Sequence, residues 1–296
     1  MPALGGRMRS HSLWLSSLAA PGIAALAAYG VVAAAPPPPR LADLPGARTS
    51  AAVDVDVELV LAVDISYSMD PDELALQREG YVEALTSPEF LGALKHGMHG
   101  RVAVTYVEWA GVIDQKVVLP WRLIDGRETA ESVAAQIGRA PQRRAYRTSI
   151  AAALTFSASL FEENGYRGIR RVIDVSGDGT NNQGPPVAIV RDEVVAKGMT
   201  INGLPIMLKR PNPSTLDIPD LDIYYEDCVI GGPGAFVVPI REREKFRDAI
   251  RTKLVLEIAG HYPEPRRIPA AADAPRISCT IGERMWQQRW GGGMDR

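Results

Sequence analysis

Short apolar runs alternate with stretches of helical periodicity along most of this 296-residue chain. Residues 59–63 have the length and the branched side chains of a strand that is buried on both faces. Soon afterwards Asp70 and Pro71 indicate a helix start, since Asp caps helices and Pro suits the first helical position. Further strands are expected at 101–109, 115–124, 171–176, 200–207 and 235–240, and further helices at 129–137, 150–161, 187–195 and 246–258.

This alternation predicts the fold class. Strands that alternate with helices of this length are typical of a doubly wound α/β fold, with a mostly parallel sheet and helices on both faces. The strands at 101–109 and 115–124 are joined by a short connection that suits a hairpin. One antiparallel strand is therefore expected at an edge of the sheet.

The alternating region, residues 53–260, is expected to form one domain. Residues 1–35 contain arginines followed by an alanine-rich apolar stretch, which is the layout of a secretory signal peptide. The stretch is also long enough to be an uncleaved signal-anchor. Residues 36–52 are expected to form a proline-rich linker, and residues 261–296 an irregular tail. Both N-terminal interpretations export the domain, either to the periplasm or extracellular space or to the outer side of the inner membrane.

Charge and cysteine content exclude several classes of function. The chain has 33 Lys and Arg against 35 Asp and Glu, so it has no overall basic field to attract nucleic acids. Its two cysteines are too few for a zinc site built from three or four thiolates. In an oxidising compartment Cys228 and Cys279 can form a disulfide that joins the tail to the domain. The alternative is two separate thiols.

Oxygen-bearing side chains follow the expected strands. Asp64, Ser66 and Ser68 come directly after the first strand, and Asp178 lies between two glycines after the strand at 171–176. Thr148 stands just before the helix at 150–161. Because open α/β sheets bind ligands at the carboxyl ends of their strands, these side chains are expected to meet there. Carboxylates and hydroxyls are hard oxygen ligands, and the set suits Mg²⁺ or Mn²⁺ rather than zinc.

A simpler interpretation of the first loop is purely structural. Asp64 and Ser66 can cap the following helix or close a turn, as Asp and Ser commonly do. A further carboxylate, Asp174, lies inside an apolar strand and is expected to have a structural partner, because a buried carboxylate without one is costly.

The pattern Asp64-x-Ser66-x-Ser68, followed by Thr148 and by Asp178 in a Gly-Asp-Gly turn, resembles the metal ion-dependent adhesion site of von Willebrand factor type A domains. The resemblance covers roughly residues 53–260, and the wider sequence resembles an uncharacterised family of exported bacterial proteins with this fold. It implies direct metal contact by the three hydroxyls, with the two carboxylates acting partly through water. Gly177 departs from the pattern, since the family has a hydroxyl residue before the last Asp.

The expected function is metal-dependent binding of a protein or peptide that presents an Asp or Glu, without enzymatic activity. The sequence has no Gly-x-Ser-x-Gly nucleophile elbow and no lysine-bearing phosphate loop beside the acidic residues. A membrane is an expected partner only if the N-terminal segment is an uncleaved anchor.

Two alternatives to this function stay open. One is a metal-assisted hydrolase in which Asp64 or Asp178 activates water or a phosphoryl group. The other is a metal with a purely structural role. Four arginines before Thr148 either attract an acidic partner to this edge or belong to a solvated loop: Arg139, Arg143, Arg144 and Arg147.

Overall fold

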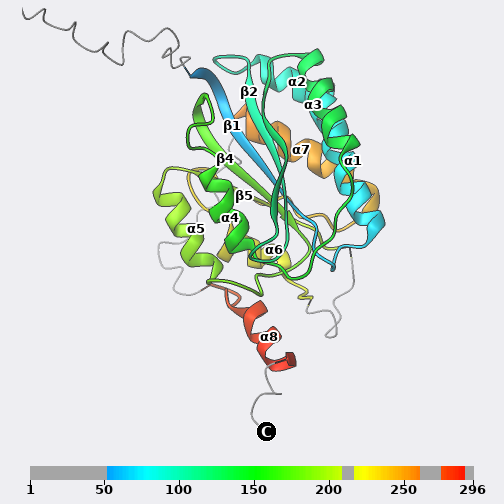
Figure 1. The fold of residues 1–296 in the computed structure, drawn as a ribbon, viewed down its shortest axis with the longest axis vertical. Helices are drawn as coiled ribbons and strands as arrows, with labels where there is room; N and C mark the ends of the chain where they lie inside the picture. The colour runs from blue at the N-terminus through cyan, green and yellow to red at the C-terminus, as the bar shows by residue number, and fades with distance from the viewer. Residues whose placement is uncertain (1–51, 209–216, 261–274, 291–296) are drawn as a thin grey trace, which may run out of the picture. The chain divides into compact units, whose positions relative to one another are not determined.

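The computed structural model describes residues 52–208, 217–260 and 275–290 (Figure 1). The expected signal peptide or anchor at 1–35 and nearly all of the expected linker at 36–52 lie outside these residues. None of the described helices is long and apolar enough to cross a membrane.

The core of the fold is a five-stranded sheet in the order β3-β2-β1-β4-β5. Neighbouring strands are parallel except for β3, which runs antiparallel to β2 at one edge, as expected. The strands are β1 (Val53–Asp64), β2 (Val102–Trp109), β3 (Gln115–Ile124), β4 (Tyr166–Gly177) and β5 (Thr200–Pro205). The predicted α/β fold with one antiparallel edge strand is confirmed.

β1 lies at the centre because its side chains are apolar on both faces. Leu59, Leu61 and Val63 pack into one hydrophobic core, while Val60 and Ala62 pack into a second core on the opposite face. All five are fully buried or nearly so. Alternation of side chains along a strand gives this two-sided packing directly.

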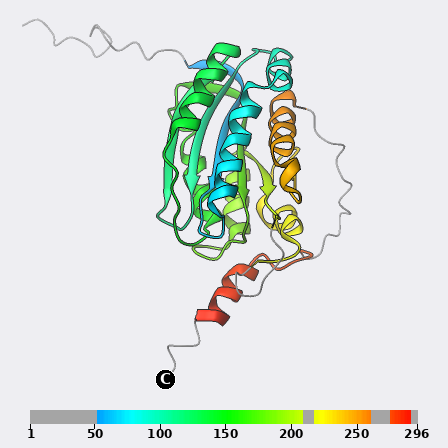
Figure 2. The ribbon, with the colours of Figure 1, turned by 90° about the vertical axis from the view of Figure 1, so that its right-hand side faces the viewer.

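Helices cover both faces of the sheet (Figures 1 and 2). α1, α2, α3 and α7 pack on the first core, with α1 and α7 side by side in Figure 2, and α4 and α5 pack on the second. Their bounds are α1 (Pro71–Thr86), α2 (Pro88–Lys95), α3 (Arg127–Arg139), α4 (Ile150–Ser159), α5 (Val187–Ala196) and α7 (Phe246–Ala259). A short helix α6 (Leu221–Tyr224) continues into a π-helical turn, η2 (Tyr225–Val229), and a 3-10 turn, η3 (Arg243–Lys245), precedes α7.

The strand expected at 235–240 does not form a regular ladder. This segment touches the sheet only through isolated bridges, Gly203 to Val237 and Ile206 to Ile240. Pro205 on β5 offers a physical reason. The N–H groups of Val238 and Ile240 donate to β5 carbonyl oxygens, but Pro205 has no N–H to donate back to Val238.

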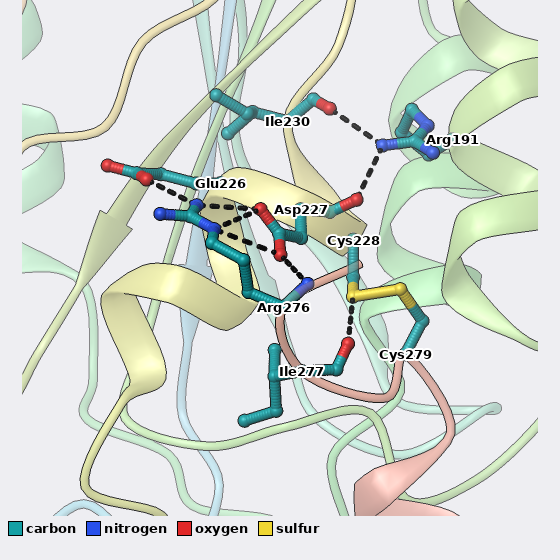
Figure 3. A network of polar contacts seen from close by, with 8 residues as sticks. All are labelled: Arg191, Glu226, Asp227, Cys228, Ile230, Arg276, Ile277 and Cys279. Carbon is teal, nitrogen blue, oxygen red and sulfur yellow. Dashed lines mark hydrogen bonds and ion pairs between the residues drawn. A yellow bond between two sulfur atoms is a disulfide. The ribbon is translucent and has the colours of Figure 1, made fainter. Parts of the chain in front are cut away.

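The tail is only partly described, and the expectation that it is irregular is wrong for its described end. Residues 281–290 form helix α8 (Ile281–Trp290). Cys228 in η2 and Cys279 just before α8 form a disulfide (Figure 3). A covalent link to the domain therefore precedes the helix, and the prediction of the disulfide is confirmed.

Asp174 has the structural partner that its position required. The Lys253 ammonium on α7 lies 2.6 Å from Asp174 Oδ1 and 2.5 Å from Glu257 Oε1, and all three side chains are buried. Burial raises the pKa of Glu257 to about 7, with the charge of Asp174 adding to the rise and Lys253 opposing it. The pKa of Lys253 is raised because attraction to both carboxylates outweighs burial, which lowers it. The cluster joins β4 to α7.

Replacing Lys253 with Met should destabilise the fold by about 3–5 kcal/mol, because it leaves two buried carboxylates without their cation. The measurement is the free energy of unfolding in urea. The matched control is Lys245→Met, which removes an exposed ion pair with Glu242 and should have little effect. Equal stability of the two variants would show that the buried cluster contributes nothing specific.

Candidate metal centre

The carboxyl ends of β1 and β4 bring the two predicted aspartates together. The strands pair in parallel with Val63 opposite Ser176, so Asp64 ends β1 and Asp178 follows β4 at the same edge of the sheet. Asp64 is fully buried, and Asp178 is 9% exposed. Long-range sheet pairing, rather than the loops alone, sets the approach of the two carboxylates.

Hydrogen bonds link the Ser66–Ser68 turn to both aspartates. The Ser66 N–H donates to Asp64 Oδ1 at 2.7 Å, and the Ser66 and Ser68 hydroxyl oxygens lie 2.7 Å apart. The Ser68 hydroxyl then donates to Asp178 Oδ1 at 2.6 Å. Four of the predicted site residues therefore form one continuous polar cluster.

The cap of α1 lies outside this cluster. Asp70 caps the helix: its carboxylate accepts from the Glu73 N–H, and the Glu73 carboxylate accepts from the Asp70 N–H. The interpretation of Asp64 and Ser66 as helix caps is therefore wrong, although Asp64 does close a local turn with Ser66. With the cap supplied by Asp70, the side chains of the preceding loop are available for another role.

Thr148 is held against the loop that carries Asp178. Its N–H donates to Asn182 Oδ1 at 3.1 Å, and its carbonyl oxygen accepts from the Asn182 N–H at 2.9 Å. A Cβ at Gly179 would lie 3.8 Å from the Thr148 hydroxyl oxygen. Asp64 at the end of β1 and the other four predicted site residues, which belong to loops, thus lie at the same end of the sheet.

One oxygen of this cluster has no hydrogen-bond partner. Asp64 Oδ2 is buried and unpaired, which is costly for a carboxylate in a protein interior. Burial raises the pKa of Asp64 well above its ordinary value, and the charge of Asp178 raises it further. A divalent cation would offset both effects, so the orphaned oxygen and the hydroxyls around it fit a hard metal ion. Within the described ranges no cluster of three or more His, Cys, Asp and Glu side chains offers a different kind of metal site.

Gly177 is required by close packing. A Cβ at this position would lie 2.8 Å from Asp64 Oδ2 and 3.0 Å from the Tyr225 hydroxyl oxygen, with no room for a side chain. The hydroxyl residue that the resemblance leads one to expect at this position would therefore not fit. Asp178 instead receives its hydrogen bond from Ser68.

Sequence reasoning missed two supporting residues. Gln77 on α1 donates from Nε2 to the Asp64 carbonyl oxygen at 3.1 Å, and the buried Tyr225 hydroxyl lies 3.5 Å from the Gly177 carbonyl oxygen. Gln77 lies about two helical turns after the cap residue Asp70, and this spacing alone is only a weak indication that its side chain contacts Asp64. Tyr225 belongs to a π-helical turn with no sequence signature that we recognise.

Two of the four arginines line the edge of this site. The Arg144 guanidinium donates to the carbonyl oxygens of Tyr67 and Met69 at 2.8 and 2.7 Å, and it lies 4.6 Å from the centre of the Tyr67 ring. Tyr67 in turn stacks on Tyr146 with ring centroids 4.3 Å apart. Arg147 directly precedes Thr148, whereas Arg143 lies 3.8 Å from Glu108 and Arg139 ends α3.

The described histidines lie elsewhere. The His99 N–H donates to Asp56 at 2.8 Å, near the amino end of β1 and therefore at the opposite end of the strand from Asp64. His96 follows α2 in the same connection. Neither is placed to act as a base at the aspartate cluster.

Changing Gly177 to Ala should destabilise the protein by about 1–3 kcal/mol, because the new methyl group overlaps the Asp64 carboxylate. Gly179→Ala is the matched control, since its Cβ would meet only atoms at ordinary contact distance. Urea denaturation of both variants gives the comparison. A Gly177→Ala protein as stable as the Gly179→Ala protein would mean that the close approach at Asp64 is not a constraint.

Solved structures share the fold of this domain. Proximal thread matrix protein 1 from the mussel byssus, in a form described as having a zinc-occupied MIDAS motif, matches with a TM-score of 0.50 and 18% identity over 70% of this chain and 49% of that one. A von Willebrand factor type A protein from Catenulispora acidiphila matches with a TM-score of 0.46 and 14% identity over 69% of this chain and 43% of that one. The chain thus spans about half the length of the mussel protein.

The likeness to the mussel protein supports the von Willebrand factor type A-like fold that the resemblance in the sequence implied. Among curated proteins, no sequence matches this chain. A family model does match, over residues 54–262, which is nearly the whole alternating region. The chain belongs to the family described as "Protein of unknown function (DUF1194)".

Proposed function

We propose that this protein is an exported binding module that uses a Mg²⁺-type ion at the carboxyl edge of the sheet to capture an acidic group of another protein or peptide. The observation that carries the proposal is the polar cluster of Asp64, Ser66, Ser68 and Asp178, in which a buried carboxylate oxygen has no hydrogen-bond partner. Thr148 belongs to the adjoining loop and completes the proposed ligand set.

The ligand types favour capture of an anion. Ser66, Ser68 and Thr148 are neutral, so they coordinate a cation without cancelling its charge. An ion bonded directly to neutral hydroxyls, with the two carboxylates acting partly through water, would keep affinity for a further carboxylate, which is the chemistry that the metal would supply. The mussel protein with a zinc-occupied MIDAS motif supports metal binding by this fold; for the present chain the oxygen-only set favours Mg²⁺ or Mn²⁺.

The surface beside the cluster supports a protein partner. Tyr146 is 73% exposed and Tyr67 is 47% exposed, although they stack on each other, and Arg144 lies against Tyr67. Exposed tyrosines and arginines are the residues that most often anchor protein interfaces. Among the described residues His99 lies at the far end of β1, so neither it nor the neighbouring His96 could serve as a base at this cluster.

The disulfide supports export. Cys228–Cys279 joins the end of α6–η2 to the start of α8, and such bonds persist mainly in oxidising compartments. This agrees with the signal peptide or anchor predicted for residues 1–35. The proposed location is the periplasm or the extracellular space.

Calorimetric titration of the full chain with Mg²⁺ and Mn²⁺ tests the metal site. We expect saturable binding to the wild type and none to Asp64→Asn, which keeps the shape of the side chain but removes its charge. Glu242→Gln, an exposed acid far from the loops in sequence, serves as the control and should bind like the wild type. Equal affinity of the wild type and Asp64→Asn would refute the proposed site.

The ligand class is tested with a pair of synthetic peptides that differ only by Asp or Asn at one position. In Mg²⁺ the Asp peptide should bind more tightly than the Asn peptide, and EDTA should abolish the difference. Fluorescence anisotropy of labelled peptides measures both. A protein that binds Mg²⁺ but treats the two peptides alike would fit a structural metal instead.

A further inference from the structure

Helix α8 contacts the two loops that carry the proposed metal ligands. The Asn181 Nδ2 donates to the Glu283 carboxylate at 2.7 Å, and the Arg147 guanidinium lies 3.2 Å from the centre of the Trp286 ring. Gly282 is buried against the backbone of Asn181, so closely that no Cβ would fit there. One helix thus touches the loop after β4 and the loop before α4.

The loop residues that α8 contacts are neighbours of the proposed ligands. Asn181 follows Asp178 by three positions and is fully buried. Its side-chain oxygen accepts from the Ala151 N–H in the first turn of α4, and its own N–H donates to the Tyr224 hydroxyl at 3.1 Å. Asn181 therefore fixes the spacing between the Asp178 loop and the helix that begins just after Thr148.

Arg147 immediately precedes Thr148 and has an unusual backbone. Its φ is 74°, in the left-handed region that residues with a Cβ rarely adopt. Such a conformation persists only when surrounding contacts hold it. The stack on Trp286 is one such contact, and it holds the residue on which the position of Thr148 depends.

The hydrophobic contact of α8 with the domain core is small and is made by the partly buried Ile281 at its first position. The helix has ten residues, of which only Gly282 is buried, and Trp290 at its end is 60% exposed. A helix this short is marginal without tertiary contacts. Its placement depends on the attachment that precedes it.

That attachment is covalent and ionic (Figure 3). Beside the Cys228–Cys279 disulfide, the Arg276 guanidinium lies 2.6 Å from both Glu226 and Asp227, and the Arg276 N–H donates to Asp227 Oδ2 at 2.6 Å. These acids belong to the η2 turn, which Arg191 on α5 holds through the Ile230 carbonyl oxygen at 3.0 Å.

We propose that α8 is a tethered positioning element for the metal centre. Through Glu283 and Trp286 it holds the loops of Asp178 and Thr148 at the spacing that the ion requires, and the disulfide keeps it there. This inference rests on the proposed metal-binding function. Glu283 and Trp286 are positioning residues, since they contact neighbours of the ligands rather than the ligands themselves.

The test compares full-length proteins with the disulfide intact. In the double variant Glu283→Ala/Trp286→Ala, calorimetry should show Mn²⁺ affinity reduced on the order of tenfold, as for other residues that orient metal ligands. The control is Gln288→Ala, an exposed change on the same helix, which should leave the affinity unchanged. The conservative pair Glu283→Gln/Trp286→Phe keeps a hydrogen-bond acceptor and a ring, and it should restore most of the affinity.

Hydrogen exchange without metal gives an independent readout. The N–H groups of Thr148, Ala151 and Asn182 should exchange faster in the Glu283→Ala/Trp286→Ala protein than in the wild type, while those of β1 should not change. If the wild type binds Mn²⁺ and the Glu283→Ala/Trp286→Ala protein binds it with the same affinity, the positioning role of α8 is overturned while the proposed function stands. A wild type that does not bind Mn²⁺ would refute the proposed function, and unchanged exchange at the three N–H groups would then refute the positioning role as well.

Discussion

The parallel pairing of β1 with β4 is the constraint on which the rest of this structure depends. The two strands are adjacent at the centre of the sheet, and their register sets Val63 opposite Ser176. Two aspartates distant in sequence therefore end at one edge, where the Ser66–Ser68 turn can bridge them. The pairing is stable because β1 is apolar on both faces, which requires helices on both sides. Burial of the aspartates is a direct consequence of that arrangement.

Close packing surrounds the buried Asp64 carboxylate. Gly177 lets the Asp64 carboxylate approach the chain, and Tyr225 fills the space beyond it. The same end of the sheet carries polar groups that are satisfied within the protein, such as the Asp70 cap of α1. Asp64 Oδ2 is a buried acceptor without a donor, and under the proposed function a divalent cation would offset that cost.

Much of this arrangement was predictable, because it follows from local patterns and one general rule. The apolar run before Asp64 indicated a buried strand, and the rule that ligands bind at carboxyl ends of parallel strands located the site. That Asp174 has a partner was predictable from its burial, whereas the identity of the partner was not, since Lys253 lies on a helix far away in sequence. The closeness of Gly177 to Asp64 depends on three-dimensional packing that no spacing reveals.

The errors also have physical causes. Residues 235–240 have the composition of a strand, but Pro205 on the neighbouring β5 cannot donate to a ladder with them. α8 buries little apolar surface beyond Ile281, so its sequence gives little helical signal, and contacts with Asn181 and Arg147 help to stabilise it. α2 was predictable in principle, because Ser87 followed by Pro88 is the same kind of helix start as Asp70 and Pro71.

The most direct test of a metal centre at this edge of the sheet is a crystal structure of the full chain grown with Mn²⁺, with anomalous scattering measured at the manganese edge. The account predicts one anomalous peak bonded directly to the Ser66 and Ser68 hydroxyls, with Asp64 and Asp178 beside it. A peak at any other place, or none between these loops at saturating Mn²⁺, would contradict it.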